Sequence, residues 1–480
     1  MEVREGHPAE AVRVDGVMSR TTPHSEARDR SPGPDTSGEP VASVMRWGLG
    51  RDARLLIAGQ GVRAAGYGFT AVILGALLAA RGYGPLQAGV VLTAMIAGTA
   101  LASLVVGRLA DRVGRRRCYA VFFLAVALAG AVVAAGAPFW LLLMVALTGT
   151  LSTDVVDNGP ATTLEQVMLA GEDSGTARAY GRYNAVGAIS GALGALAAAA
   201  PGLGRDGTGG AVHAWLFLAL VPVGLAGALF AWQLSPAVEA PPAEPDPDRP
   251  EAIAAPTAPG RLGESRSVVR RLAALFAVDA AGGGLVTTGF LSYFFAQRYG
   301  VTVASLGWLF FTVSLVQAIS VMLAPRLARR FGLVATMVGT HLPSNVLLAS
   351  VAFAPTFPVA ATLLVARTTL SQMDVPTRQA LVMSVVTKGE RTAAAAVTNA
   401  ARYTVRPLGP LVAGAVQQVA LGAPLLVAGV IKGAYDIALW RWARHLPLAR
   451  PGAVVEPVKA IPPTVPTDRP RPQPNAKETP

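Results

Sequence analysis

The chain has 480 residues, of which 52% are hydrophobic and only 15% are charged, and its mean hydropathy is +0.45. Soluble domains carry about a quarter charged residues, so this deficit excludes an ordinary soluble fold and indicates a surface that faces lipid. The net charge of +12 would suit a nucleic-acid-binding protein, but the arginines gather in short connections between apolar segments, as membrane topology requires. We therefore expect the lipid bilayer as a partner, and no nucleic acid.

The N-terminal segment and the cysteine content narrow the class of protein further. Residues 1–45 are polar, with Pro, Ser and charges of both signs, and they contain no apolar core of a signal peptide. We predict a disordered tail there and expect the first membrane span to serve as the insertion signal. The single cysteine, Cys118, excludes an internal disulfide framework and a cysteine-based metal site, and we expect no metal.

From residue 54 onward the chain is a succession of apolar segments, each near the roughly 20 residues that a helix needs to cross a bilayer. Only helices satisfy their own backbone in lipid at this length, so the fold class is predicted to be an all-α integral membrane protein. The fifth predicted span is rich in Gly and Ala, and polar residues interrupt the fourth and tenth. The twelve predicted spans are 54–80, 85–107, 118–136, 138–160, 179–200, 212–233, 268–296, 302–325, 332–354, 357–385, 392–418 and 421–444.

The connection between the second and third spans is dense in arginine and reads Gly107-Arg108-Leu109-Ala110-Asp111-Arg112-Val113-Gly114-Arg115-Arg116-Arg117. Lys and Arg accumulate in short cytoplasmic loops, and the loops on this face carry twelve of them against three on the other. This asymmetry predicts that both termini are cytoplasmic. The twelve are Arg108, Arg112, Arg115, Arg116, Arg117, Arg178, Arg182, Arg326, Arg329, Arg330, Lys388 and Arg391, against Arg81, Arg205 and Arg298.

The chain also repeats itself. The arginine-rich connection returns weakly at 325–332, about 218 residues later, and two further matches fall at a shift of 216. One of them aligns Arg63-Ala64-Ala65-Gly66 with Asp279-Ala280-Ala281-Gly282. Repeated halves with a path at their interface are a recurrent plan of transporters. We predict an N-terminal six-helix bundle over 46–234, a cytoplasmic linker over 235–266, a C-terminal six-helix bundle over 267–446 and a disordered, Pro-rich tail over 447–480.

The connection at 107–116 resembles the loop signature of the major facilitator superfamily, and the resemblance covers about 54–444. It implies twelve helices in two pseudo-symmetric bundles and secondary transport by alternating access. It also implies that Asp111 lies near the eleventh helix and stabilises the outward-open state, with Arg402 and Arg406 as candidate partners. Two elements usual in proton-coupled drug antiporters are missing, an Arg in the fourth helix and a Gly-Pro in the fifth. The gating loop would comprise Gly107, Asp111, Arg112, Gly114 and Arg115.

Ionisable residues inside the spans are the candidate transport path, because a charge at the bilayer centre costs roughly 2.5–3.5 kcal/mol on insertion scales. Arg63 and Asp279 occupy equivalent positions and have opposite signs, so we predict an ion pair that breaks on substrate or proton binding. The alternatives are a permanent structural pair and an Arg63 that extends to the interface. Arg367 would be the counter-ion of an acid or of an anionic substrate.

Spans four and ten each place an acid just before a proline, in Asp157-Asn158-Gly159-Pro160 and Asp374-Val375-Pro376. Proline opens a helix and frees carbonyl groups, so these elements are gating acids or polar groups that stabilise a kink. Asp374 and Arg378 are four residues apart and should pair. We expect His341 only to form hydrogen bonds, and Lys432 and Asp436 to form a structural pair. The substrate and proton-path candidates are Arg63, Asp279, Asp157, Asp154, Glu165, Arg367, Asp374 and Arg378.

These observations predict a monomeric secondary transporter in the cytoplasmic membrane of a bacterium, acting on a small-molecule substrate. No phosphate-binding loop of the Gly-x-x-x-x-Gly-Lys-Ser/Thr kind is present, so we expect a proton gradient as the energy source, and no cofactor. No cluster of histidines or nucleophiles suggests an enzyme. Efflux of an amphipathic or hydrophobic compound is the favoured function. Proton-coupled uptake of a polar metabolite, or a non-transporting receptor or scaffold, are the alternatives.

Overall fold

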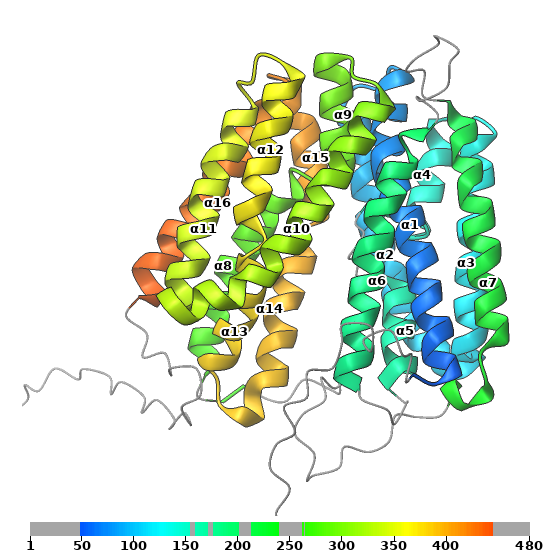
Figure 1. Cartoon of the computed structure of the whole chain (residues 1–480), viewed down its shortest axis with the longest axis horizontal. Helices are drawn as coiled ribbons and strands as arrows, with labels where there is room; N and C mark the ends of the chain where they lie inside the picture. Colours follow the sequence, from blue (N-terminus) through cyan, green and yellow to red (C-terminus); the bar gives the residue numbers. More distant parts are fainter. Residues whose placement is uncertain are drawn as a thin grey trace, which may run out of the picture. The chain divides into compact units, whose positions relative to one another are not determined.

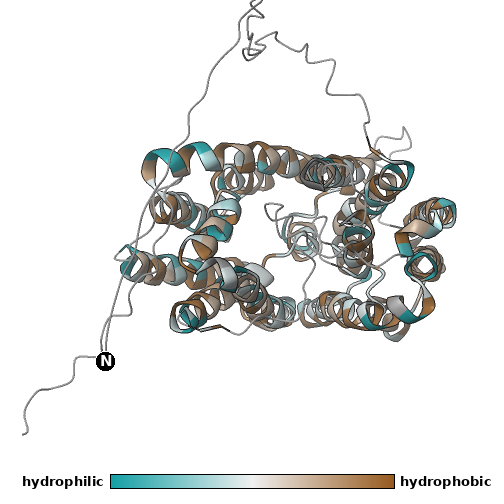
Figure 2. Cartoon of the chain, turned by 90° about the horizontal axis from the view of Figure 1, so that it is seen from below, coloured by the Kyte–Doolittle hydropathy of each residue, from teal (hydrophilic) through white to brown (hydrophobic). Residues whose placement is uncertain are grey.

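The computed structural model describes residues 49–153, 159–170, 176–200, 213–239, 262–263 and 265–444, and over these ranges the regular secondary structure is helical (Figure 1). The predicted acids Asp154 and Asp157 lie outside the described residues. Figure 2 looks along the helices and shows hydrophobic segments on most of them. The chain is thus an all-α membrane protein, as its composition predicted.

The first half begins with three long helices. The left-handed backbone of Gly114, with φ +105°, allows the chain to leave one helix and enter the next directly, and Gly332 (φ +87°) does the same in the second half. The helices are α1 (Arg51–Ala80), α2 (Pro85–Val113), α3 (Arg115–Ala134), α4 (Phe139–Leu147), α5 (Pro160–Ala170), α6 (Thr176–Ala197) and α7 (Leu220–Gln233), with 3-10 helices η3 (Ala214–Ala219) and η4 (Pro236–Glu239).

The second half repeats this plan with more interruptions. Thr287 and Thr302 cap the helices that follow them, because their hydroxyls accept from the backbone N–H groups of Phe290 and Ser305. The helices are α8 (Arg266–Gly284), α9 (Thr288–Tyr299), α10 (Val303–Phe331), α11 (Leu333–Val351), α12 (Phe357–Ser371), α13 (Asp374–Ser384), α14 (Arg391–Val405), α15 (Leu408–Gln417) and α16 (Ala423–Ala443), with the 3-10 helix η5 (Lys388–Glu390).

Eight helical stretches of the described residues are long and apolar enough to cross a membrane. They correspond to predicted spans one, two, three, six, seven, eight, nine and twelve. The tenth and eleventh spans are each divided into two short helices, α12 and α13, and α14 and α15. In the fourth span, predicted over 138–160, α4 covers only the first part and α5 begins at the last residue. Two of these short helices begin at the acid–proline elements, α5 at Pro160 and α13 at Asp374. Polar residues therefore lie where the helical backbone is interrupted. The seventh span is divided as well, between α8 and α9.

Each half packs mainly within itself, α1 against α6 and α7, and α8 against α14 and α16. The two halves meet where α1 contacts α9, α2 contacts α15 and α6 contacts α10. Glycines permit this approach: a Cβ atom added to Gly75 would lie 2.2 Å from the carbonyl oxygen of Gly289. Hydrogen bonds from Ser292 Oγ to the carbonyl of Val72 (2.5 Å) and from Tyr293 Oη to the carbonyl of Tyr83 (2.8 Å) also join the halves. These contacts lie toward the end opposite the arginine-rich loop.

Candidate functional site

A buried ion pair lies at the middle of the first half. The carboxylate of Glu165 on α5 accepts a hydrogen bond from Arg63 Nη2 on α1 at 2.7 Å, and the two side chains are 0% and 1% exposed. Tyr119 Oη on α3 donates to the same carboxylate at 2.6 Å, and Tyr183 Oη on α6 donates at 2.5 Å. Four helices therefore converge on this group, which we call the Arg63–Glu165 cluster. Sequence patterns indicated both charges but missed the tyrosines.

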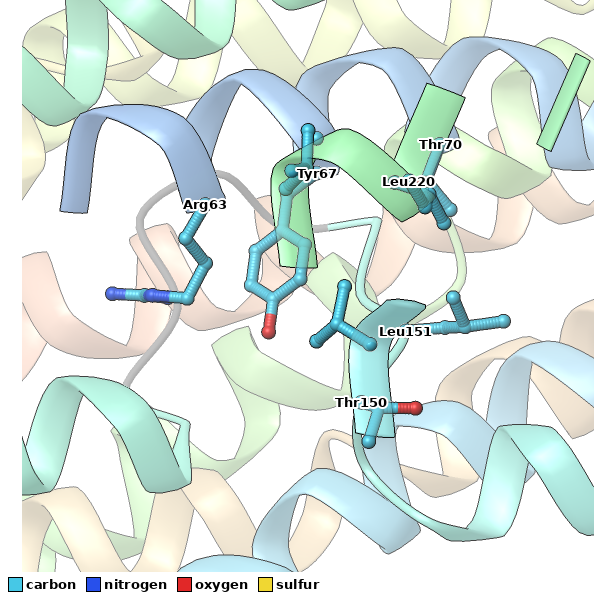
Figure 3. Close-up of a pocket in the computed structure, with 9 residues that line it drawn as sticks. Arg63, Tyr67, Thr70, Thr150, Leu151 and Leu220 are labelled. Atoms are coloured by element: carbon cyan, nitrogen blue, oxygen red, sulfur yellow. The ribbon is translucent and has the colours of Figure 1, made fainter. Parts of the chain in front are cut away.

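The remaining contacts of Arg63 enclose its charge. Its Nη2 donates to Thr162 Oγ1 at 2.9 Å and to the side-chain oxygen of Gln60, and its guanidinium lies 5.4 Å from the ring centre of Tyr67. A narrow pocket runs from Arg63 past Tyr67 toward Thr70 (Figure 3), and it has no space for a water molecule. The ion pair is thus held in a dry environment, where electrostatic attraction is strong and an unpaired charge is costly.

A second charged group lies in the other half. Asp279 on α8 binds the ammonium group of Lys432 on α16, lies 3.5 Å from Arg378 Nη1 on α13 and 3.8 Å from His341 Nε2 on α11. Asp279 itself is buried. Again four helices supply the residues, which we call the Asp279 cluster.

A second layer of ionisable groups surrounds the Asp279 cluster. Arg378 Nη1 donates to Asp374 at 2.7 Å, which confirms the predicted pair. His341 Nδ1 lies 2.8 Å from Asp436 Oδ1, and Asn345 donates to the other oxygen at 2.8 Å. His341 therefore lies between two carboxylates. Lys432 and Asp436, expected to pair along α16, bind groups on α8 and α11, and among the described residues no ion pair joins them.

The predicted ion pair between Arg63 and Asp279 is wrong for this structure. Each charge is neutralised inside its own half, Arg63 by Glu165 and Asp279 by Lys432. The physical reason is proximity, because the counter-charge on a neighbouring helix of the same half removes the cost of burial without joining the two halves.

The sequence matches the family model of the Major Facilitator Superfamily over residues 56–410. The chain belongs to this superfamily. An uncharacterized membrane protein of Saccharomyces cerevisiae is 27% identical over 391 residues, 76% of this chain and 87% of that protein. The nucleoside transporter NupG has a TM-score of 0.62 at 13% identity, with 81% and 97% of the two chains covered. The D-xylose-proton symporter has a TM-score of 0.56 at 13% identity, with 81% and 97% covered.

As a superfamily member, the chain is a multi-pass secondary transporter with the fold that its loop signature predicted. The signature itself forms the end of α2 and the start of α3. Arg112 lies in the last turn of α2, and nothing lies within 4 Å of a Cβ atom added to Gly107. The side chain of Asp111 lies outside the described residues, so its gating contact stays a prediction.

A residue that sequence patterns missed caps the transporter's third helix. Glu239, at the end of η4, accepts the backbone N–H groups of Arg115 at 2.7 Å and of Arg116 at 3.0 Å. A carboxylate at the positive N-terminus of a helix is stabilising, and here it replaces a local capping side chain. No local pattern reveals this cap, because Glu239 lies 124 residues beyond Arg115.

A similar cap lies at the start of the second half. The carboxylate of Glu390 accepts the backbone N–H groups of Gly263 and of Ser265, the latter at 3.3 Å. The hydroxyl of Ser265, and then the N–H of Gly263, lower the pKa of Glu390 below its ordinary value of 4.5. Each half of the transporter thus carries an acidic cap supplied from a distant segment.

Proposed function

We propose that this transporter exports a small amphipathic compound across a bacterial cytoplasmic membrane in exchange for protons. The observation that carries the proposal is the pair of buried carboxylates, Glu165 and Asp279, each bonded to a cation on a neighbouring helix. When such a carboxylate takes up a proton, it becomes neutral and its ion pair with the cation breaks, so the charge of the site changes. That change is the event that proton coupling requires.

The arrangement of the halves supports alternating access. All the ion pairs of each charged cluster lie within one half. Each half can therefore move as a unit without breaking these ion pairs. The contacts between the halves are close glycine packing and a few hydrogen bonds, of which the bond from Tyr293 to the carbonyl of Tyr83 is one. A net hydrogen bond contributes only about 0.5–1.5 kcal/mol, so this interface can open and close at modest cost.

Two further observations bear on the coupling ion and the substrate. The D-xylose-proton symporter, which shares the fold, uses a proton by its name, and this supports a proton as the coupling ion here. The narrow lining beside Arg63 is largely apolar and includes Leu151, Leu220 and Val223, so it would suit the apolar part of a compound in a conformation where these helices separate.

The test is transport by the purified protein in proteoliposomes with an imposed pH gradient and a pH-sensitive dye in the lumen. Compounds come from a sensitivity screen of cells with and without the transporter. We expect substrate-driven proton flux in the wild type and its loss in Glu165→Gln and Asp279→Asn. Glu390→Gln, which changes a partly exposed cap that belongs to neither cluster, should retain the flux and serves as the control.

Three outcomes would contradict parts of the proposal. Substrate flux that ignores the gradient, or proton flux that survives both cluster substitutions and Asp374→Asn, rules out coupling through these acids. Accumulation of the compound inside cells would indicate uptake of a metabolite in place of export.

A further inference from the structure

The cations of the second half outnumber the acids that hold them. Lys432 is bonded to Asp279 and Arg378 to Asp374, while Asp436 is bonded by His341 and Asn345. Two further arginines complete the group, Arg367 on α12 and Arg402 on α14. Among the described residues neither guanidinium makes a hydrogen bond or an ion pair, and the Nε atoms of both are buried.

Both arginines lie near the middle of the membrane. Arg367 is the eleventh residue of α12 and Arg402 the twelfth residue of α14. At 1.5 Å per residue, each is about 15–17 Å from the helix end that faces water, or half of a hydrocarbon layer about 30 Å thick. Both helices end within four residues, at Ser371 and Val405, where the predicted tenth and eleventh spans break.

The two arginines act on the same centre. The charges of Asp279 and Asp374 attract both guanidinium groups, and Arg378 repels that of Arg402. Because Asp279 and Asp374 are already bonded by Lys432 and Arg378, the additional arginines exceed what these acids need. An excess of partly buried positive charge within the span of a membrane is costly and indicates a functional role.

Other polar atoms near this centre lack partners too. Within the described part of the chain, the buried hydroxyl of Ser371, one helical turn beyond Arg367 on α12, has no hydrogen-bond partner. The same holds for the hydroxyl of Tyr435 on α16, which the charges of Asp279 and Asp374 reach. Arginine can only donate, and both hydroxyls are able to donate. A buried donor without a partner destabilises the protein, and more so when it is charged. Such a set of groups calls for an occupant that accepts hydrogen bonds.

We infer that the transported compound carries an anionic group (a carboxylate, phosphate or sulfonate) that binds Arg367 and Arg402 in the second half. The inference rests on the proposed function, because it names the chemical class of the substrate. The planar guanidinium fork matches the oxygens of these groups and forms paired hydrogen bonds to them. A neutral or cationic occupant would leave the positive charges of the two arginines uncompensated.

The test is ligand binding by the purified full-length protein in detergent, which requires neither transport nor a pH gradient. The probes are matched sets on four scaffolds (naphthalene, indole, biphenyl and an eight-carbon chain), each as the carboxylic acid, the alcohol and the amine. Binding stabilises the folded protein and raises its melting temperature with ligand concentration. We expect at least one acid to stabilise the wild type, with its alcohol and amine at least tenfold weaker in Kd.

Three variants locate the effect. Arg367→Gln and Arg402→Gln should each weaken binding of that acid about tenfold or more, as expected for loss of a charged hydrogen bond of about 1.5–3 kcal/mol. Arg329→Gln changes an exposed arginine on α10 and should leave Kd unchanged. If Arg367→Gln or Arg402→Gln fails to fold, it is replaced by the lysine substitution at the same position, which keeps the charge but loses the paired hydrogen-bond geometry.

Two results would overturn the inference: alcohols or amines that bind as tightly as the acids on every scaffold, or an acid preference that both arginine variants retain. Failure of the proposed function looks different. Acid binding that depends on Arg367 and Arg402 together with flux that ignores the pH gradient would leave the anion site intact and refute proton coupling alone.

Discussion

At the scale of single residues, the transporter buries its charges as pairs whose partners lie on neighbouring helices of one half. Arg63 and Glu165 illustrate the rule, since the ion pair is reinforced by two tyrosine hydroxyls and is closed to water. A buried pair contributes little net stability, but removal of one partner leaves an uncompensated charge. The pair therefore constrains which positions of α1, α3, α5 and α6 are compatible.

This constraint predicts the result of a double-mutant cycle. Glu165→Gln should destabilise the transporter by about 3–5 kcal/mol, because Arg63 stays buried without a counter-charge. The double variant Arg63→Gln with Glu165→Gln should be more stable than Glu165→Gln alone. Thermal unfolding in detergent measures all four proteins, and additive losses would show that the two residues do not interact.

A second residue-scale prediction concerns pH. The pKa of Glu390 in the folded protein lies below its ordinary value, so the ionised cap stabilises the start of α8 above about pH 4.5, and this contribution is lost as pH falls through the lowered pKa. In hydrogen exchange, the amides of Gly263 and Ser265 should lose protection on acidification in the wild type more than in Glu390→Gln. The effect is small, because Glu390 is partly exposed and solvent screens its interactions. Equal pH dependence in both proteins would contradict the cap.

The candidate charges of the site could be predicted from sequence, but their pairing could not. The cost of charge in lipid indicates Arg63, Glu165 and Asp279, and a spacing of four residues gives the pair between Asp374 and Arg378. Lys432 binds Asp279 across 153 residues, and only the packing of α8 against α16 brings the two together. The local periodicity of the sequence does not reveal how α8 packs against α16.

At the scale of helices, the spans that bear polar residues are also the divided ones. The tenth and eleventh predicted spans each consist of two short helices, and Arg367, Asp374 and Arg402 lie within a few residues of the breaks. A break frees backbone carbonyl and N–H groups, which lipid would not tolerate unless the break faces protein or water. Hydropathy reveals a long apolar segment well. It does not reveal where an apolar segment is divided, as between α8 and α9.

The glycine contacts between helices lead to a prediction at this scale. Gly75→Ala would place its methyl group 2.2 Å from the carbonyl oxygen of Gly289, so α1 and α9 must separate. The cost of such overpacking is about 1–3 kcal/mol, visible as a lower melting temperature in detergent. The matched control is Gly339→Ala on α11, where a Cβ atom has nothing within 4 Å and helix propensity improves by about 1 kcal/mol. A Gly75→Ala protein as stable as the wild type would refute the close packing.

At the scale of the whole transporter, the two halves meet toward the end opposite the arginine-rich loop. The interface there combines glycine packing with the hydrogen bonds of Ser292 and Tyr293. Alternating access requires this end to open, so the strength of its contacts sets the balance between the two states.

Removal of one such contact should shift that balance. Tyr293→Phe deletes the hydrogen bond to the carbonyl of Tyr83, worth about 1 kcal/mol, which corresponds to a change of about fivefold in the population of the state open at that end. Thr70→Cys in a Cys118→Ala background supplies a buried probe on α1. Its labelling by an impermeant maleimide from outside should be up to about fivefold faster in the Tyr293→Phe protein.

The control for this labelling is Tyr299→Phe. Its hydroxyl donates to the carbonyl of Ala354 at 2.9 Å, a bond of the same kind that lies inside the second half. Labelling of the probe should not change in this protein. Equal acceleration by both substitutions would mean that general loosening, and not separation of the halves, exposes the probe.

Glu239 holds the end of the first half in place. Its bonds to the backbone of Arg115 and Arg116 fasten the chain beyond α7 to the same half before it crosses to the other, and Glu390 secures the beginning of α8 in turn. A polypeptide cut between residues 239 and 262 would keep both fastenings. Two separately translated fragments divided there would each contain the carboxylate that caps their own end, and they should assemble into a two-chain transporter.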